Sequence, residues 1–207
     1  LRGRSWTTSV AIVDLDQDSI ADVFEVNYVG GDDVIERKCF QDGTDQHRSC
    51  GPLVFPAEPD RVWKGTRRGG FLESSRQWLT AEDRESVAGR GLGLVAGNLD
   101  QTGGIDVYVA NDMSANHYWS PTSGSADGFR MQEQGALRGV AFDSRSLSQA
   151  SMGIAAGDAD NDGDLDLYVT HFTREYNTLY LQLQSGVWAD RTNESLLAEA
   201  TQSLLAY

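Results

Sequence analysis

The stretch GIAAGDADNDGDLDLYVTHF, residues 153–172, holds a nine-residue acidic loop between two short apolar segments. Two other stretches align with it without gaps: SVAIVDLDQDSIADVFEVNY, residues 9–28, and GLVAGNLDQTGGIDVYVAND, residues 93–112. Each contains a small residue, an apolar run, the acidic loop and a second apolar run that carries an aromatic residue. Recurrence of one pattern along a chain indicates a repeat architecture.

The spacing of the copies is uneven. The loops begin at Asp14, Asn98 and Asp158, so the first interval is longer than the second. We interpret residues 30–59, which include both cysteines, as an insertion within the first unit. The similarity extends past each loop to a turn-rich segment followed by an aromatic residue. These aromatic residues are Phe71, Phe129 and Trp188.

Each unit offers four short strand candidates separated by turns. Val, Ile, Leu and Tyr dominate the second candidate of each unit, as expected of a buried strand. The candidates lie near residues 8–13, 22–28, 60–64 and 71–75; 92–97, 105–110, 116–120 and 128–133; and 152–157, 165–171, 177–183 and 186–190. Four strands per repeated unit are typical of propeller blades. The sequence therefore predicts an all-β fold: three β-propeller blades of four antiparallel strands, forming a partial propeller.

We expect the three blades to occupy residues 1–194. They are predicted at about residues 5–80 with the insertion 30–59, at 88–135 and at 148–192. The tail, residues 195–207, has helical spacing of leucines and is expected to form a short helix or the lead-in to a missing blade. The chain begins at Leu1, so we interpret it as a piece of a longer polypeptide. Three blades leave open sheets, which further blades of the parent chain or self-association would cover.

Loop three, residues 158–166, has the composition of a cation site. Its side-chain oxygens stand at positions 1, 3, 5 and 9 of the loop: Asp158, Asp160, Asp162 and Asp166. Gly163 at position 6 permits the left-handed turn that would fold the loop around a centre. Calcium takes six to eight oxygen ligands, so the carbonyl of Asp164 at position 7 is predicted to contribute. The side chain of Asp164 is expected to point to solvent.

The other two loops follow the same pattern with departures. Loop one places carboxylates at the same positions, with the carbonyl of Ile20 at position 7: Asp14, Asp16, Asp18 and Asp22. Ser19 replaces the glycine there. Loop two is degenerate, with the carbonyl of Gly104 at position 7 and only two carboxylates: Asn98, Asp100, Thr102 and Asp106. We therefore predict two strong calcium sites and one weaker site.

Two alternatives compete with this interpretation. An EF-hand needs Glu at position 12 and flanking helices. Only loop one has that residue, Glu25, and the flanks of all three loops indicate strands. The loops could also be acidic turns that bind no metal, although three copies in register favour a common ligand.

The loops resemble the calcium-binding repeats of FG-GAP and VCBS propellers, such as those of integrin α-subunits. Three longer strings are similar to the repeat region of the ASPIC/UnbV (cartilage acidic protein-like) family. They are CGPLVFPAEPDRVW, GLGLVAGNLDQTGGIDVYVANDM and MGIAAGDADNDGDLDLYVTHFTREYNTLY. The resemblance covers about residues 5–192. It implies a calcium-bound propeller of the cell surface or extracellular space, with no established chemistry.

Composition narrows the classes of partner. The chain has 207 residues, of which 40% are hydrophobic, and a net charge of −14. An acidic surface repels phosphate, so a nucleic-acid partner is not expected. The apolar runs are too short to predict a membrane span.

The two cysteines flank a polar stretch. Cys39 and Cys50 are expected to form a disulfide, which indicates an oxidising location: extracellular, cell-surface or periplasmic. Zinc is a poor alternative, because His47 would provide only a third ligand. Two free thiols in a reducing compartment are the other alternative.

Two functions of different classes remain. The first is a non-enzymatic module that binds a protein or glycan, with calcium in a structural role. The second is part of a calcium-dependent polysaccharide lyase or hydrolase, in which carboxylates do acid–base work. Asp112 with His117 is the nearest candidate pair for that chemistry.

Overall fold

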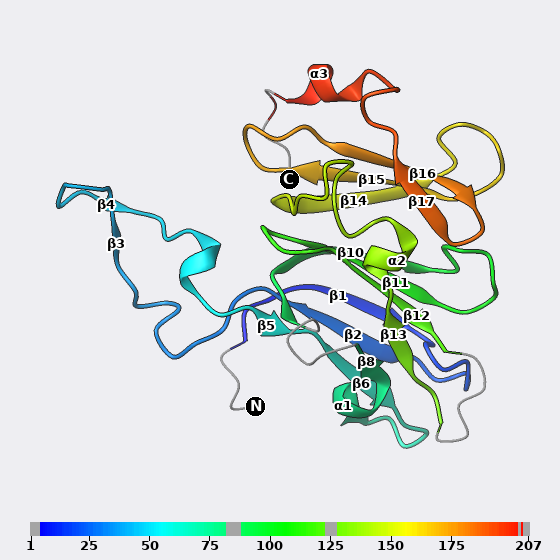
Figure 1. Ribbon diagram of the computed structural model, residues 1–207. Helices are drawn as coiled ribbons and strands as arrows, with labels where there is room; N and C mark the ends of the chain where they lie inside the picture. Colours follow the sequence, from blue (N-terminus) through cyan, green and yellow to red (C-terminus); the bar gives the residue numbers. More distant parts are fainter. Residues whose placement is uncertain (1–4, 82–87, 123–127, 203, 205–207) are drawn as a thin grey trace.

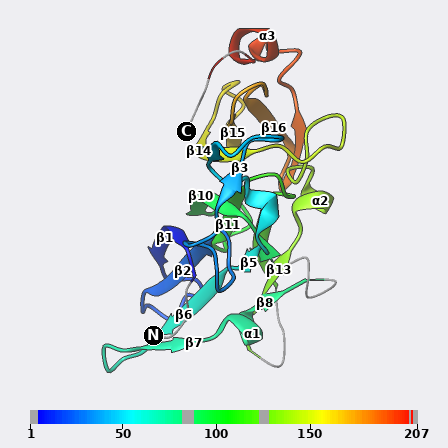
Figure 2. The same cartoon turned by 90° about the vertical axis from the view of Figure 1, so that its left-hand side faces the viewer.

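The computed structural model describes residues 5–81, 88–122, 128–202 and 204, and it is an all-β structure. Three sheets, antiparallel apart from one short edge strand, are stacked one beside the next in chain order (Figures 1 and 2). Each sheet starts with the apolar run that precedes an acidic loop. Residues 203 and 205–207 of the predicted tail lie outside the described residues.

The first sheet has the order β1-β2-β6-β7. Its strands lie where the sequence predicts them: β1 (Thr7–Val13), β2 (Asp22–Asn27), β6 (Arg61–Gly65) and β7 (Phe71–Glu73). The loop between β1 and β2 is acidic loop one. The four-residue helix α1 (Ser75–Trp78) follows β7.

The second sheet contains one strand that the sequence did not predict. Its four antiparallel strands are β10 (Gly91–Gly97), β11 (Asp106–Asn111), β12 (His117–Pro121) and β13 (Met131–Glu133). The two-residue strand β8 (Leu79–Thr80) then pairs in parallel with β13, so the sheet has five strands. A chain segment that follows the first sheet thus adds an edge strand to the second.

The third sheet has the order β14-β15-β16-β17, again as predicted. The strands are β14 (Ser151–Gly157), β15 (Asp166–His171), β16 (Thr178–Gln184) and β17 (Val187–Asp190). The short helix α2 (Gly135–Arg138) precedes this sheet in the chain, and α3 (Leu197–Thr201) follows it. The helix α3 is one of the two structures expected for the tail.

Two apolar clusters join the three sheets. Phe24 and Val62 of the first sheet pack with Val107 and Trp119 of the second. On its other face, the second sheet presents Tyr108 and Tyr118, with which residues of the third sheet pack, including Leu167, Tyr180 and Trp188. The second sheet is therefore enclosed on both faces.

The insertion in the first unit forms an arm that extends away from the sheets (Figure 1). It contains the two-stranded hairpin of β3 (Cys39–Phe40) and β4 (His47–Arg48) and the short 3-10 helix η1 (Pro52–Val54). Its last strand, β5 (Glu58–Pro59), pairs with β9 (Ala88–Gly89). The predicted disulfide between Cys39 and Cys50 closes the hairpin.

No helix among the described residues is both long and apolar enough to cross a membrane.

Candidate metal-binding loops

The three acidic loops share one backbone conformation. Position 4 is left-handed in every loop, at Gln17 (φ 60°), Gln101 (φ 60°) and Asn161 (φ 65°). Position 6 is also left-handed, at Gly103 (φ 96°) and Gly163 (φ 97°). Loop one has Ser19 at that position with φ 69°, which confirms that an L-residue occupies a conformation where glycine is favoured.

The aspartate at position 9 closes every loop in the same way. Asp22, Asp106 and Asp166 are buried, and one carboxylate oxygen of each accepts the backbone N–H of loop position 2. Those donors are Leu15 (2.9 Å), Leu99 (3.1 Å) and Ala159 (2.7 Å). The other oxygen accepts from the third strand of the sheet. Its donors are the Gly65 N–H (2.8 Å), the Ser120 hydroxyl (2.8 Å) and the Gln182 N–H (2.9 Å).

Burial raises the pKa of two of these carboxyls. For Asp22 the backbone N–H groups of Gly65 and Leu15 oppose that rise, and for Asp106 the Ser120 hydroxyl does so. Both oxygens already have protein donors. The position 9 aspartate is thus part of the fold of the loop as well as a candidate ligand.

Loop three presents the most open cluster of carboxylates. Oxygens of Asp158, Asp160 and Asp166 lie within 4.8 Å of one another, and Asp158 and Asp160 are exposed. Partial desolvation and repulsion from the Asp162 carboxylate raise the pKa of Asp160. Carboxylates that repel one another and can be reached from solvent suit a hard cation such as calcium.

Loop one gathers Asp14, Asp16 and Asp18 in the same manner, but it also contains an internal cation. The ammonium of Lys64, on the third strand, forms ion pairs with Asp16 and with Asp18, the latter at 3.0 Å. The hydrogen bond to Lys64 lowers the pKa of Asp18. Burial by itself would lower the pKa of Lys64, but the two carboxylates outweigh it and the pKa rises.

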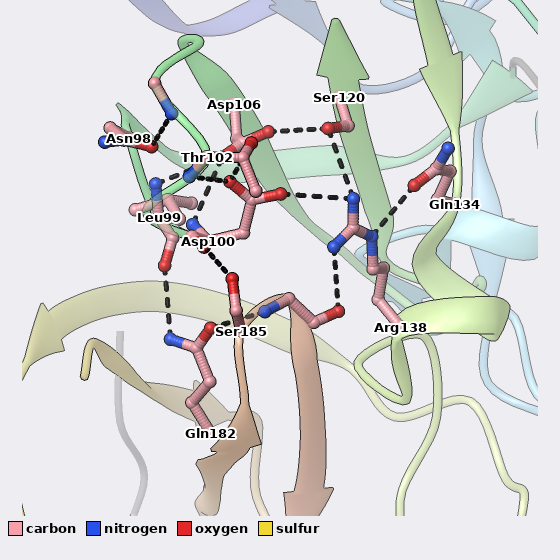
Figure 3. Close-up of polar contacts among 12 residues, drawn as sticks. Asn98, Leu99, Asp100, Thr102, Asp106, Ser120, Gln134, Arg138, Gln182 and Ser185 are labelled. Carbon is pink, nitrogen blue, oxygen red and sulfur yellow. Dashed lines mark hydrogen bonds and ion pairs between the residues drawn. The ribbon is translucent and has the colours of Figure 1, made fainter. Parts of the chain in front are cut away.

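Loop two has no third carboxylate, and the negative charge of Asp100 is balanced by the guanidinium of Arg138 (Figure 3). Asp100 is buried, and its Oδ2 lies 3.1 Å from Nη2 of Arg138. Its Oδ1 accepts hydrogen bonds from the N–H (2.9 Å) and the hydroxyl (2.7 Å) of Thr102. Asn98 accepts the N–H of Gly103.

Glutamine side chains connect the loops in series. Nε2 of Gln17, in loop one, donates to the carbonyl of Gly103 in loop two at 2.7 Å. Nε2 of Gln101, in loop two, donates to the carbonyl of Gly163 in loop three and to Oδ1 of Asp164, both at 2.9 Å. The side chain of Asp164 is therefore held by a neighbouring loop, whereas we expected it to point to solvent.

The structure brings together only part of each predicted ligand set. Positions 1, 3 and 5 cluster in loop one, and positions 1, 3 and 9 cluster in loop three. Asp22 and Asp162 lie outside these clusters, and Asp162 accepts the N–H of Asp164 at 2.9 Å. The carbonyl ligands at position 7 stay predictions.

Lys64 and Arg138 were not found by the sequence reasoning, because neither lies in an acidic loop. Lys64 could have been suspected from the strand register. Trp63, Trp119 and Tyr180 each pair with the residue after the position 9 aspartate. The next residue along each third strand therefore lies near the loop, and in the first sheet that residue is Lys64. No comparable rule points to Arg138.

The proposed acid–base pair is not assembled. Asp112 accepts the hydroxyl of Tyr28 at 2.5 Å, and the side chain of His117 lies 3.9 Å from the carboxylate of Asp60. No hydrogen bond or ion pair joins Asp112 to His117 within the described part of the chain.

Comparison with known proteins gives one match. Residues 98–169 match the family model of the FG-GAP-like repeat. This segment is similar to the FG-GAP-like repeat. The match starts at the first residue of loop two and ends within β15, so it includes loops two and three, and it supports a propeller-like arrangement of the sheets. A search of curated proteins found no match to the chain.

Proposed function

We propose that this chain is a calcium-binding, extracellular β-propeller module that contacts a protein or glycan partner. The carboxylate cluster of loop three, which lies within the FG-GAP-like repeat, is the observation that carries this proposal. In this proposal the three sheets are blades of one propeller, over residues 1–194. Further blades would cover its outer sheets, and its repeat region is of the ASPIC/UnbV type.

Calcium has a structural role in this proposal. Asp158, Asp160 and Asp166 would hold the ion together with the carbonyl of Asp164 and water. The ion would neutralise carboxylates that otherwise repel one another across less than 5 Å. A ligand that binds only the folded chain stabilises it, by about 2.7 kcal/mol at a concentration of 100 times its dissociation constant.

The proposed location outside the cytosol has two supports. Disulfides form and persist mainly in oxidising compartments, and Cys39 is bonded to Cys50. FG-GAP-like repeats occur typically in extracellular modules, and residues 98–169 are similar to this repeat. Both are compatible with an extracellular, cell-surface or periplasmic protein.

A binding surface is available beside the acidic loops. A hollow between loops one and two is lined by polar side chains, two aliphatic side chains and one aromatic ring. They include Gln17, Thr102 and Thr122, then Leu15 and Pro121, and Phe129. Such a mixture suits polar contacts with a protein or glycan more than burial of an apolar ligand. The rival lyase or hydrolase function has no comparable support, because Asp112 and His117 have separate partners.

Calorimetric titration of calcium into EDTA-treated protein, with thermal melts beside it, tests the proposal. We expect binding of calcium and a higher melting midpoint. Asp160→Asn should remove the loop-three site and reduce the rise in midpoint. Asp164→Asn is the matched control in the same loop, since its predicted ligand is the backbone carbonyl and the amide oxygen can still accept from Gln101. Absence of both heat and midpoint shift in the unaltered chain would contradict the proposal.

A further inference from the structure

Each side chain at a ligand position of loop two already has a protein partner (Figure 3). Oδ1 of Asp100 accepts two hydrogen bonds from Thr102, and Oδ2 accepts none but forms the ion pair with Arg138. Asp106 accepts from Ser120 and from the amides of Leu99 and Asp100. The side-chain carbonyl of Asn98 accepts the N–H of Gly103 at 3.0 Å.

The guanidinium that faces Asp100 is held from several sides. Arg138 is the last residue of α2, and its side chain donates to the carbonyl of Gly186, in the turn between β16 and β17, at 2.9 Å. Its Nε donates to Gln134 at 2.8 Å, and its guanidinium carbon lies 5.3 Å from the ring centre of Tyr118. Planar contacts of this kind fix an arginine more firmly than a single ion pair would.

The same guanidinium therefore connects two sheets. It pairs with a loop of the second sheet and with a turn of the third. A second hydrogen bond runs beside it, from the hydroxyl of Ser185 to the carbonyl of Asp100 at 2.5 Å. In addition, Nε2 of Gln182 donates to the carbonyl of Leu99 at 3.2 Å.

From this geometry we infer that Arg138 replaces the cation of loop two: the loop binds no divalent ion, and the guanidinium supplies the positive charge that pins the second sheet to the third. The donor set does not fit calcium, because only two carboxylates are present: Asp100 is already paired with the cation of Arg138, and Asp106 accepts three hydrogen bonds from the protein. Thr102 replaces the third acid and donates its hydroxyl to Asp100.

The three loops then differ in their counter-charge. Loop two has Arg138, which makes several polar contacts and whose side chain is 18% exposed. Loop one has Lys64, whose side chain is 32% exposed and whose ammonium is a single point charge on a flexible stem. Loop three has no basic side chain paired with its carboxylates among the described residues. Calcium affinity should accordingly be highest in loop three, lower in loop one and absent in loop two.

A double-mutant cycle in EDTA tests the arginine alone, without calcium. Asp100→Asn and Arg138→Met should each lower the melting midpoint, and the double variant should fall no further than the larger single loss. Additive losses would overturn the pairing. If Arg138→Met does not fold, Arg138→Lys takes its place in the test. Lysine keeps the positive charge but lacks the planar guanidinium, so this variant should fold and have a lower melting midpoint than the unaltered chain.

A second test measures the effect of calcium, and it rests on the proposed function. The loss of midpoint caused by Asp100→Asn should be the same in EDTA and in calcium, whereas that of Asp160→Asn should appear only in calcium. The variant Asp16→Asn/Asp160→Asn should bind no calcium by calorimetry. Residual binding that disappears on adding Asp100→Asn would overturn the inference. If the unaltered chain binds no calcium at all, the proposed function fails while the cycle in EDTA still decides the role of Arg138.

Discussion

Among single residues, His171 carries a titratable side chain in a buried position. It is the last residue of β15, fully buried, and its backbone N–H donates to the side chain of Asn177 at 2.9 Å. Burial lowers the pKa of its imidazole to about 4. The charged form is costly there, because the ring is removed from water.

This pKa predicts a loss of stability in mild acid. An unfolded histidine has a pKa near 6.5, so between about pH 6.5 and pH 4 the unfolded chain binds the proton more readily than the folded chain. The free energy of unfolding should therefore decrease as the pH is lowered from about 6.5 to 4, by about 3 kcal/mol in all. Urea unfolding of the unaltered chain and of His171→Gln at several pH values would measure it.

The exposed His47 offers the matched control for that experiment. His47→Gln should retain the pH dependence of the unaltered chain, while His171→Gln should lose most of it. An equal slope in all three proteins would show that other groups dominate the acid response.

Among the elements, the disulfide hairpin lies away from the three sheets (Figure 1). Its strands β3 and β4 have two residues each, and both residues of β4 are exposed. The segment that follows the hairpin is bound to the sheets by Arg90, which donates hydrogen bonds to the carbonyls of Pro52 (3.3 Å) and Phe55 (3.1 Å). The hairpin should consequently open as a local unit.

Reduction of the disulfide tests that independence. A cross-link in a segment that unfolds with the whole domain would contribute about 3 kcal/mol through loop entropy. For a locally opening hairpin, we expect the main melting midpoint to stay nearly unchanged in the Cys39→Ser/Cys50→Ser variant. Limited proteolysis should cut faster within residues 33–55. A large fall in the midpoint would show instead that the arm folds together with the sheets.

The strands could be predicted from the sequence because each depends on local pattern. Alternating or continuous apolar runs and their aromatic residues recur at matching places, and repetition removes the ambiguity of a short run. The added strand β8 could not be predicted, because its two residues gain their pairing only from the neighbouring sheet. The same limit applies to Arg138, which lies 38 residues after its partner Asp100 in the chain, at the end of α2.

The metal-site motif showed a different limit. The aspartates at position 9 match the pattern of a ligand, yet each also accepts backbone and third-strand hydrogen bonds that close the loop. A sequence pattern shows that a carboxylate recurs at a position. It does not show whether that carboxylate stabilises the fold of the loop or binds a metal ion.

At the level of the whole molecule, stability should depend most on the second sheet. Trp119 is fully buried in the cluster between the first and second sheets. Trp119→Ala should lower the free energy of unfolding by about 3–5 kcal/mol, because it leaves a large cavity that neighbours cannot fill. Chemical denaturation monitored by circular dichroism would measure the loss.

Trp6 provides the comparison for Trp119, since half of it is exposed. Trp6→Ala should cost less, about 1–2 kcal/mol, because half of the side chain already lies in water. Similar losses for the two variants would contradict a stability centred on the interfaces between sheets.

The position of the long arm shows where this architecture tolerates new sequence. The arm leaves the first sheet between β2 and β6, at the end of the strands away from the acidic loop (Figure 1). The corresponding connections of the other sheets run from Asn111 to His117 and from His171 to Thr178. A foreign peptide grafted into either connection would enter at the same end of its sheet, at the opposite end of the strands from the acidic loop. The repeat thus offers variable display sites at one end of its strands and keeps its charged loops at the other.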